Sequence, residues 1–527
     1  MSDWNEGYIT DIGYTYGYYT ELNPLRARLA LLAAGWAAPA MLSDGPACEL
    51  GMGQGVSVNV HAAASGNTWY GTDFNPSQTA FAQELAGVSG VDAQGTRLFD
   101  EAFADFCQRT DLPDFSFIGV HGIWSWISDA NRAVIVDFVR RKLRVGGVLY
   151  ISYNTQPGWA AMAPMRDLLA EHAQVMGAPG KGMTGRIDAA LAFADRLMDS
   201  NCHYAQANPQ IAARLKRLQS ANRNYLAHEY FNHDWQPMSF TSMARWMSSA
   251  KLGYGCSAHY LDHLPALNFN PAQNALLQEQ PDAMFRETVR DFLVNQQFRR
   301  DYWIKGPRKL APADQARALR DQRVILAHAP ADVSTKVKAP VGEATLTPAI
   351  YGPVVAALAD HQVHSIGEVW QQLQTGASKS AISFAQLTEA ILLLAGTGDV
   401  VAVQDAAAVQ KAKPQTQKLN RHLLDMARNH ADINCVASPV SGAGVTVTRF
   451  QQLFLLAMLE GKTPLAKPEP AALAAFAWAT LLAQGQRLLK DGQPMNLAQD
   501  NIDELTVQAI EFVNKRLPTL RLLGVVD

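Results

Sequence analysis

An acidic residue is followed by three alternating glycines at Glu49, Gly51, Gly53 and Gly55. Glycine allows the turn between a strand and a helix to adopt positive φ, and it lets a ligand approach the backbone closely. A dinucleotide-binding loop follows the pattern Gly-x-Gly-x-x-Gly, but the sixth residue counted from Gly51 is Val56. The spacing therefore argues against a nicotinamide dinucleotide site.

The same residues suit S-adenosylmethionine (SAM), because a carboxylate at position 49 would accept hydrogen bonds from the ammonium group of the methionine part. Asp73 follows Glu49 by 24 residues, near the distance at which an acidic residue binds ribose hydroxyls in nucleotide-binding α/β folds. We predict that Asp73 accepts both hydroxyls and that Phe74 covers one face of the adenine. A turn without a ligand is the alternative for both motifs.

A further acidic pair follows the apolar run 96–99. A carboxylate at this strand end would accept a hydrogen bond from the adenine amino group, whereas two solvated loop acids are the alternative. We assign this contact to Asp100 ahead of Glu101.

The next apolar run, 115–120, leads into His121 and Gly122. The backbone at these two residues is expected to pass beside the methionine part of the cofactor. Trp124 and Trp126 follow, and they are predicted to contact the substrate. Packing in the core would explain each ring equally well.

Methyl transfer from a sulfonium is an in-line displacement that requires an aligned, desolvated nucleophile. A lysine acceptor must first lose a proton, which a tyrosine hydroxyl would assist, and aromatic rings attract the methyl-bearing cation. The predicted lining of the acceptor pocket combines aromatic rings with one polar amide: Tyr14, which also contacts the cofactor, Tyr16, Tyr18, Tyr19, Trp124, Tyr153 and Asn154. Alternatively, the four N-terminal tyrosines fix their segment onto the sheet.

Composition describes a soluble globular protein, with 48% hydrophobic and 18% charged residues and a net charge of -3. This charge provides no overall basic field for nucleic acid. The longest uncharged stretches, 29–43 and 470–486, contain proline or glycine and are shorter than the roughly 20 apolar residues that span a bilayer. Residues 1–12 lack the pattern of a signal peptide, so we expect a cytoplasmic protein without a membrane span.

The five cysteines are odd in number and scattered, which is typical of reduced thiols in the cytosol. Cys256, His259, Asp262 and His263 have a spacing that resembles a zinc site, but the sequence offers no obvious fourth ligand pair. We therefore predict no metal.

Alternating strands and helices are predicted from residue 22 to about 153, which indicates βαβ units and a parallel, Rossmann-like sheet in an α/β fold. The predicted strands are short apolar runs at 47–50, 68–72, 96–99, 115–120 and 148–152, with two later strands at 254–260 and 297–304. Helices are expected to begin at Asn75 and Pro76 and to cover 129–144, where Gly146 and Gly147 stop the second helix.

Five units are expected along the chain. They are a SAM-binding core (1–165), a helical insertion (166–235), the completion of the sheet (236–310), a winged-helix-like regulatory domain (311–410) and a mostly helical C-terminal domain (411–527). The winged-helix pattern consists of helices at 349–358, 365–374 and 383–394 and a short strand pair at 399–402, with a polar linker at 411–417. Only one basic residue lies among four acidic ones in 348–403, which argues against binding of DNA.

These motifs together resemble the class I methyltransferases that carry a methyltransferase regulatory domain, a family that includes bacterial lysine methyltransferases of outer-membrane proteins. The matching segments are 49–55, 121–126, 152–159, 226–232, 437–440 and 450–456. The string at 152–159 is the most specific of them. In this family a tyrosine- and proline-rich N-terminal element folds over SAM, but segment 14–19 here lacks the internal proline and has extra tyrosines.

The sequence thus predicts a SAM-dependent methyltransferase whose acceptor is a protein side chain such as lysine. Two alternatives stay open: methylation of a sugar or other small molecule, and a catalytically silent SAM-binding scaffold that recruits a partner. The expected partners are the protein or small-molecule acceptor and, as an option, a second copy in a homodimer.

Overall fold

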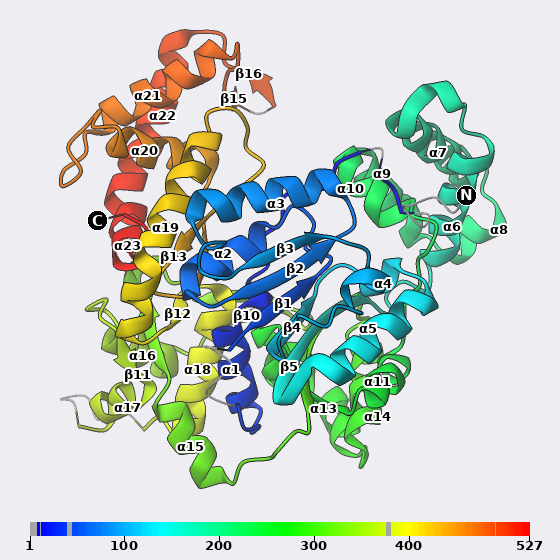
Figure 1. Cartoon of the computed structure of the whole chain (residues 1–527), viewed down its shortest axis with the longest axis horizontal. Helices are drawn as coiled ribbons and strands as arrows, with labels where there is room; N and C mark the ends of the chain where they lie inside the picture. The colour runs from blue at the N-terminus through cyan, green and yellow to red at the C-terminus, as the bar shows by residue number, and fades with distance from the viewer. Residues whose placement is uncertain (1–7, 11, 39–44, 376–380, 491, 527) are drawn as a thin grey trace.

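A seven-stranded sheet forms the centre of the protein, in a computed structural model that describes residues 8–10, 12–38, 45–375, 381–490 and 492–526. The strand order is β3-β2-β1-β4-β5-β7-β6, and β7 runs antiparallel to both neighbours while β1 to β5 pair in parallel (Figure 1). The strands are β1 (Ala47–Leu50), β2 (Trp69–Asp73), β3 (Arg97–Asp100), β4 (Phe115–Val120), β5 (Leu143–Asn154), β6 (Leu252–Ser257) and β7 (Phe298–Lys305). The predicted α/β fold is confirmed.

Helices cover both faces of this sheet. One apolar core joins one face to α1 (Pro24–Ala33), α2 (Val56–Ser65) and α3 (Pro76–Ser89). A second core joins the other face to α4 (Phe103–Phe106), α5 (Asp129–Lys142) and α11 (Phe240–Ser249), which packs on α14 (Ala283–Leu293). The short helices α12 (Pro265–Asn268) and α13 (Pro271–Gln278) lie between β6 and α14 in the chain.

Local chemistry explains where these helices begin and end. The Asn75 side chain accepts a hydrogen bond from the Ser77 amide and Pro76 occupies the first turn, so α3 begins where predicted. The helix predicted over 129–144 instead ends at Lys142, because Leu143 pairs with Phe115 as the first residue of β5. The two glycines lie inside that strand.

The helical insertion predicted for 166–235 forms a bundle with a core of its own. It contains α6 (Ala163–Val175), α7 (Gly182–Asp199), α8 (His203–Ala207), α9 (Gln210–Gln219) and α10 (Arg223–Tyr230). Figure 1 places this bundle on the side of the sheet opposite the C-terminal helices.

The segment after β7 contains the three helices expected of the winged-helix-like unit. Its helices are α15 (Pro312–Arg320), α16 (Pro348–Ala357), α17 (Ile366–Thr375) and α18 (Phe384–Thr397), and its strands are β8 (Arg323–Leu326), β9 (Lys336–Ala339), β10 (Gly342–Thr345), β11 (His364–Ser365) and β12 (Val400–Val403). The predicted strand pair at 399–402 is wrong, because β12 is a single strand that pairs with β8 from before the helices.

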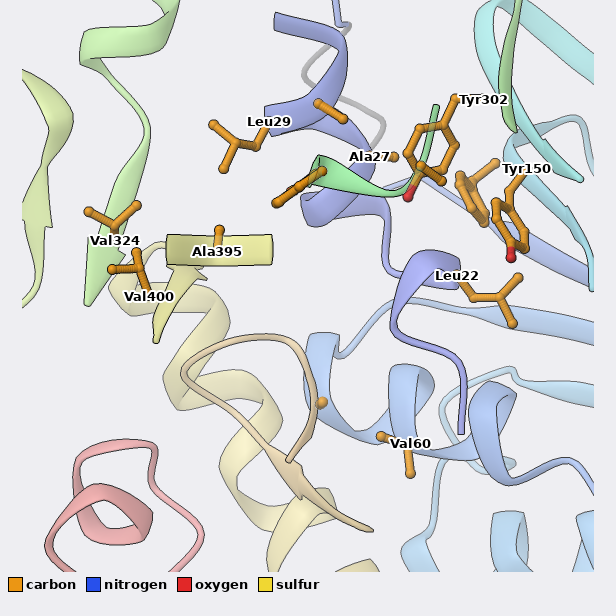
Figure 2. Packing of buried hydrophobic residues seen from close by; sticks show 14 of the residues in the cluster. Leu22, Ala27, Leu29, Val60, Tyr150, Tyr302, Val324, Ala395 and Val400 are labelled. Atoms are coloured by element: carbon orange, nitrogen blue, oxygen red, sulfur yellow. The ribbon is translucent and has the colours of Figure 1, made fainter. Parts of the chain in front are cut away.

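The core of this unit is continuous with that of the sheet. Figure 2 shows Tyr150 and Tyr302 of the sheet, Ala27 and Leu29 of α1, and Val324, Ala395 and Val400 of the later unit within one buried cluster. Burial of apolar area of this kind is the main favourable contribution to folding. The later unit therefore packs directly onto the central sheet through α1.

The C-terminal part is mostly helical, as predicted. It contains α19 (Ala406–Met426), β13 (Cys435–Ser438), β14 (Ala443–Thr446), α20 (Arg449–Leu459), α21 (Pro470–Ala483), β15 (Leu489–Lys490), β16 (Gln493–Pro494), α22 (Ala498–Glu511) and α23 (Leu517–Leu522). The linker predicted at 411–417 is wrong, because Ala412 and Thr416 are fully buried within α19, which packs on α2 and α3. None of the helices in the described part of the chain is long and apolar enough to cross a membrane.

Candidate active site

A cavity opens at the carboxyl ends of β1, β2 and β4, and its empty space of about 1170 Å³ includes open solvent at the mouth. Ligands of open α/β sheets bind at this edge, where the connections of the strands diverge. Eleven of the predicted site residues line the cavity: Tyr14, Tyr19, Glu49, Gly51, Gly53, Gly55, Asp73, Phe74, His121, Gly122 and Trp126.

The glycine loop between β1 and α2 needs its three glycines for conformation and for space. Gly51, Gly53 and Gly55 have φ of 70°, 54° and 67°, a region that other residues rarely adopt. A Cβ on Gly55 would lie 2.3 Å from the Ala82 Cβ of α3. The loop thus keeps its backbone exposed to the cavity while α2 and α3 pack closely.

Glu49 places a carboxyl group on the cavity wall at the end of β1. The residue is 2% exposed, and its Oε2 atom has no hydrogen-bond partner within the described chain. Burial, with a smaller contribution from the charge of Asp73, raises the pKa of Glu49 to about 8. A positive group bound here would stabilise the ionised carboxylate.

Asp73 at the end of β2 is held by two backbone amides. Its Oδ2 accepts from Gly53 N at 2.9 Å and its Oδ1 from Asn75 N at 3.0 Å. Burial raises the pKa of Asp73 to about 6. Both oxygens keep a lone pair for a ligand hydroxyl, and the adjacent Phe74 ring makes an edge contact with Tyr8 at a centroid distance of 5.8 Å.

The structure reverses the prediction for the two acids at the end of β3, Asp100 and Glu101. Asp100 is exposed and lies outside the cavity, whereas Glu101 lines it. Arg109 donates to Glu101 Oε1 at 2.6 Å, and Glu101 Oε2 is buried without a partner in the described chain. The assignment to Asp100 is corrected to Glu101, because the residue that ends β3 points away from the cavity and the next one faces it.

His121 and Tyr19 stack on each other at the cavity wall, with ring centroids 3.5 Å apart. His121 Nδ1 hydrogen-bonds the Tyr150 hydroxyl at 2.7 Å, and burial lowers the pKa of His121 to about 4. The imidazole is therefore neutral near pH 7. Gly122, with φ of 65°, donates its amide to Ser152 Oγ at 2.9 Å and fixes the loop after β4.

Two of the N-terminal tyrosines face away from the cavity. The Tyr18 hydroxyl accepts from Gly444 N at 2.7 Å, and Tyr16 packs edge-on against Phe81 and stacks on His430. Their predicted place in the acceptor pocket is corrected to a contact with the C-terminal part. From Thr15 to Tyr19 alternate residues of the segment point to opposite sides, with Thr15, Gly17 and Tyr19 on the cavity and Tyr16 and Tyr18 facing away from it.

Three further predicted residues lie in the core and not on the cavity wall. The fully buried Tyr153 donates its hydroxyl to Asp301 Oδ2 at 2.9 Å. Trp124 is also fully buried and directs its indole NH to Met238, while Asn154 is 4% exposed and its backbone amide donates to Ser125 Oγ. The string at 152–159 thus fastens the end of β5 to β7 and to the segment before α11.

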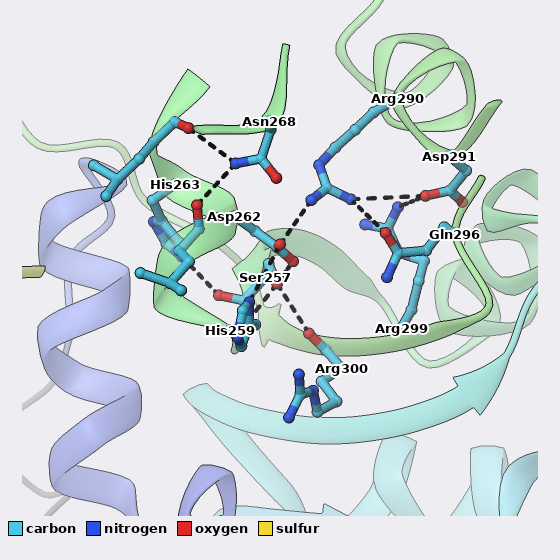
Figure 3. Close-up of polar contacts among 12 residues, drawn as sticks. Ser257, His259, Asp262, His263, Asn268, Arg290, Asp291, Gln296, Arg299 and Arg300 are labelled. Atoms are coloured by element: carbon cyan, nitrogen blue, oxygen red, sulfur yellow. Dashed lines mark hydrogen bonds and ion pairs between the residues drawn. The ribbon is translucent and has the colours of Figure 1, made fainter. Parts of the chain in front are cut away.

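Three of the residues with zinc-like spacing, His259, Asp262 and His263, take part in a network of polar contacts. Asp262 pairs with Arg290 at 2.9 Å and contacts His259, and the His263 ring donates to the Ser257 carbonyl at 2.7 Å (Figure 3). The Arg290 guanidinium holds the pKa of Asp262 well below its usual range, against the effect of burial. Within the described residues, no three His, Cys, Asp or Glu side chains are placed to hold a metal ion.

The sequence reasoning missed Tyr8 and Glu229. Tyr8 lines the cavity from the N-terminal segment, and Glu229 accepts a hydrogen bond from Tyr14 at 3.3 Å. Glu229 lies in the quoted motif 226–232, so the motif itself was a signal. Its partner is 215 residues away in the chain, which local patterns do not reveal.

The described residues fit SAM. The glycine loop leaves room where a Cβ would intrude, and unpartnered carboxylate oxygens at Glu49 and Glu101 match the ammonium and adenine amino groups. Asp73 stands between them for the ribose. The sheet order and this set of residues define a class I methyltransferase.

Comparison with known proteins agrees. Residues 222–305 match a family described as "Predicted methyltransferase regulatory domain". An uncharacterized protein of Synechocystis, sll1526, is 36% identical over 524 residues, which cover 99% of each chain. This chain therefore belongs to the same family as sll1526, and over residues 222–305 it carries the predicted methyltransferase regulatory domain.

Solved structures share the fold over nearly the whole chain. The structure of PKMT2 from Rickettsia typhi in complex with AdoHcy has a TM-score of 0.66 at 14% identity, covering 96% of this chain and 99% of that one. A second structure of the same Rickettsia protein has a TM-score of 0.65 at 15% identity. The likeness extends beyond the sheet to the helical insertion and the C-terminal part.

Proposed function

We propose that this protein transfers the methyl group of SAM to the side-chain amine of lysine in a protein. The observation that carries the proposal is the composition of the cavity: a site that fits SAM continues into a wall of tyrosine rings backed by Glu229. Aromatic rings and a carboxylate are the groups that attract an ammonium ion.

Each wall residue has a role in this proposal. SAM supplies an electrophilic methyl group on a sulfonium. Glu49 orients the methionine part through its ammonium, Asp73 holds the ribose, and Glu101 accepts from the adenine amino group. His121 stays neutral at pH 7 because of its lowered pKa, so it does not repel a sulfonium beside it.

Two observations favour a protein acceptor over a small molecule. The likeness to PKMT2, a lysine methyltransferase, covers almost the whole chain. Contacts outside the cavity also hold the N-terminal segment that lines it. The insertion bonds the backbone of Ile9 and Ile12, and the strand pair β13–β14 bonds the Tyr18 hydroxyl. Accessory parts thus frame the cavity, as would suit a large substrate.

The test is incubation of the protein with deuterated-methyl SAM and a cell extract, followed by mass spectrometry of every labelled species. We expect label on lysine side chains, and none when the Asp73→Ala variant replaces the wild type. Label on a sugar or another small molecule would establish the alternative acceptor. Binding of SAM without any labelled product would establish the silent scaffold.

We also propose a cytoplasmic, reducing location and retain the homodimer as a prediction. All five cysteines are free thiols and four of them are buried, which suits a reducing compartment. Light scattering after size-exclusion chromatography measures the oligomeric state directly.

A further inference from the structure

Glu229 occupies a position between two segments of the cavity wall. It lies on α10 of the insertion and accepts a hydrogen bond from the Tyr14 hydroxyl at 3.3 Å. The backbone carbonyl of the same residue accepts from the indole NH of Trp126 at 3.5 Å. Both donors line the cavity, so the half-buried Glu229 side chain is directly behind its aromatic wall.

No described Lys, Arg or His forms an ion pair with Glu229. Two basic side chains of the same insertion are engaged elsewhere: Arg214 donates to the Tyr230 hydroxyl at 3.2 Å, and the His228 ring bonds the Ile12 carbonyl while burial lowers the pKa of that ring. A carboxylate in aromatic surroundings without a cation is an unusual arrangement, because an ionised group below the surface normally has a partner.

The Glu229 carboxyl helps to raise the pKa of four surrounding tyrosines, which are all neutral at pH 7. They are Tyr8, Tyr14, Tyr19 and Tyr225; Asp73 also acts on Tyr8, and Glu49 also acts on Tyr19. Arg214 acts on Tyr225. Burial raises the pKa of Glu229 to about 7, and the Tyr14 hydrogen bond opposes this only in part. The carboxyl therefore changes its charge near neutral pH, and a positive ligand would favour its ionised form.

We propose that Glu229 and Tyr14 bind the ammonium group of the methyl acceptor and remove its excess proton. The inference rests on the proposed function. An N–H bond of the ammonium breaks and its electron pair stays on nitrogen. The Tyr14 oxygen takes that proton while its own hydroxyl proton passes to the Glu229 carboxylate. The products are a neutral amine and a protonated Glu229, which later releases the proton to solvent.

Three variants separate this role from a structural one. Glu229→Gln keeps the shape and hydrogen-bonding capacity of the side chain but cannot take a proton. Glu229→Asp keeps the carboxylate and should restore part of the activity. Glu171→Gln, at an exposed glutamate on α6 of the same insertion, is the matched control.

The kinetic readout is the pH dependence of kcat/KM for methylation of protein. The wild type should rise with pH and level off above about 7, the pKa of Glu229. Glu229→Gln should lose on the order of 100-fold at pH 7, and its rate should keep rising toward the pKa of free lysine near 10. Affinity for SAM should stay within about 3-fold, since no group that we assign to SAM is removed. A wild-type pH profile in Glu229→Gln, or an equal loss of SAM affinity, overturns the proposal.

A second readout does not depend on turnover. In protein with ¹³C-labelled glutamate, the wild type should show a carboxyl resonance that titrates near 7 and is missing in Glu229→Gln. Addition of n-butylammonium chloride, which carries the ammonium of a lysine side chain, should shift that titration to lower pH in the enzyme bound to S-adenosylhomocysteine (AdoHcy). No shift overturns the inference. If the wild type labels no protein lysine, the proposed function fails, while this titration still decides whether Glu229 binds an ammonium ion.

Discussion

The two ends of the cavity are built differently. The cofactor end is made by consecutive pieces of chain, since β1, the glycine loop and β2 follow one another and Glu49 pairs in register with Gly71. The proposed acceptor end joins side chains that are far apart in sequence, such as Tyr14 and Glu229. The first end is fixed by the backbone ladder of the sheet, whereas the second depends on how the insertion packs against the N-terminal segment.

Both ends nevertheless contain a carboxyl group with a raised pKa. Glu49 and Glu229 each present a carboxyl whose pKa is raised by burial, and within the described chain neither has a cationic partner. In our account the missing cations are the ammonium of SAM at one end and the ammonium of the acceptor at the other. The difference lies in rigidity, and the following experiments separate the two ends on that basis.

The largest effect should come from Glu49→Gln in the SAM-free protein. The folded pKa of about 8 lies above the ordinary 4.5, so the folded state binds the extra proton and its free energy of unfolding falls as pH rises between these values. The glutamine variant does not titrate and should be more stable at pH 8 by up to about 4 kcal/mol. Urea unfolding at a series of pH values measures this difference. If the free energy of unfolding has the same pH dependence in both proteins, the pKa of Glu49 is not raised in the folded state.

Gly55→Ala should test the rigidity of the cofactor end. The new Cβ would meet Ala82 at 2.3 Å in a backbone with φ of 67°, so we expect a loss of about 2 to 3 kcal/mol in the free energy of unfolding. Gly87→Ala is the matched control on α3, where a Cβ meets nothing within 4 Å. That control should gain about 0.5 to 1 kcal/mol. Equal effects at both glycines would contradict the close packing of α2 on α3.

Tyr153→Phe should distinguish a core role from an acceptor role. Loss of its hydrogen bond to Asp301 should lower the free energy of unfolding by about 1 to 2 kcal/mol. Affinity for SAM should change less than about 2-fold, because the ring stays in place. Chemical denaturation and calorimetric titration give the two values, and unchanged stability with lost methyl transfer would return Tyr153 to the acceptor pocket.

The smallest effect should separate the two faces of the N-terminal segment. Tyr18→Phe removes the acceptor of the Gly444 amide and should reduce stability by about 1 kcal/mol while methyl transfer continues. Tyr14→Phe should slow methyl transfer and leave the stability nearly unchanged, since the Tyr14 hydroxyl bonds Glu229 behind the cavity wall. Thermal unfolding measures the stability of both variants, and initial rates measure their methyl transfer. If both variants lose only stability, or both lose only methyl transfer, the two faces of the segment do not have separate roles.

The sequence predicts the cofactor end of the cavity better than the proposed acceptor end. Strands β1 and β4 and the start of α3 were predicted at their observed residues, because burial patterns and capping chemistry are local. The glycine loop and Asp73 reach the cavity for the same reason. At the next strand end, the choice between Asp100 and Glu101 depended on a single residue of register, and the prediction took the wrong one.

The acceptor end required contacts that a linear pattern does not contain. Tyr16 and Tyr18 are the same residue type as Tyr14 and Tyr19 and lie in the same segment, but they contact the C-terminal part instead of the cavity. The polar stretch 411–417 read as a linker because it lacks large apolar residues, yet small residues such as Ala412 allow α19 to pack on α2. Tertiary packing decides both cases.

The most direct test of the account is a calorimetric titration of SAM into the wild type, Asp73→Ala and Asp100→Ala. Loss of two hydrogen bonds to the charged Asp73 should weaken binding by about 3 kcal/mol, or roughly 100-fold. Asp100→Ala should bind within about 3-fold of the wild type, since that exposed residue lies outside the cavity. Absence of SAM binding by the wild type, or equal binding by the wild type and Asp73→Ala, would contradict the assignment of this cavity to the methyl donor.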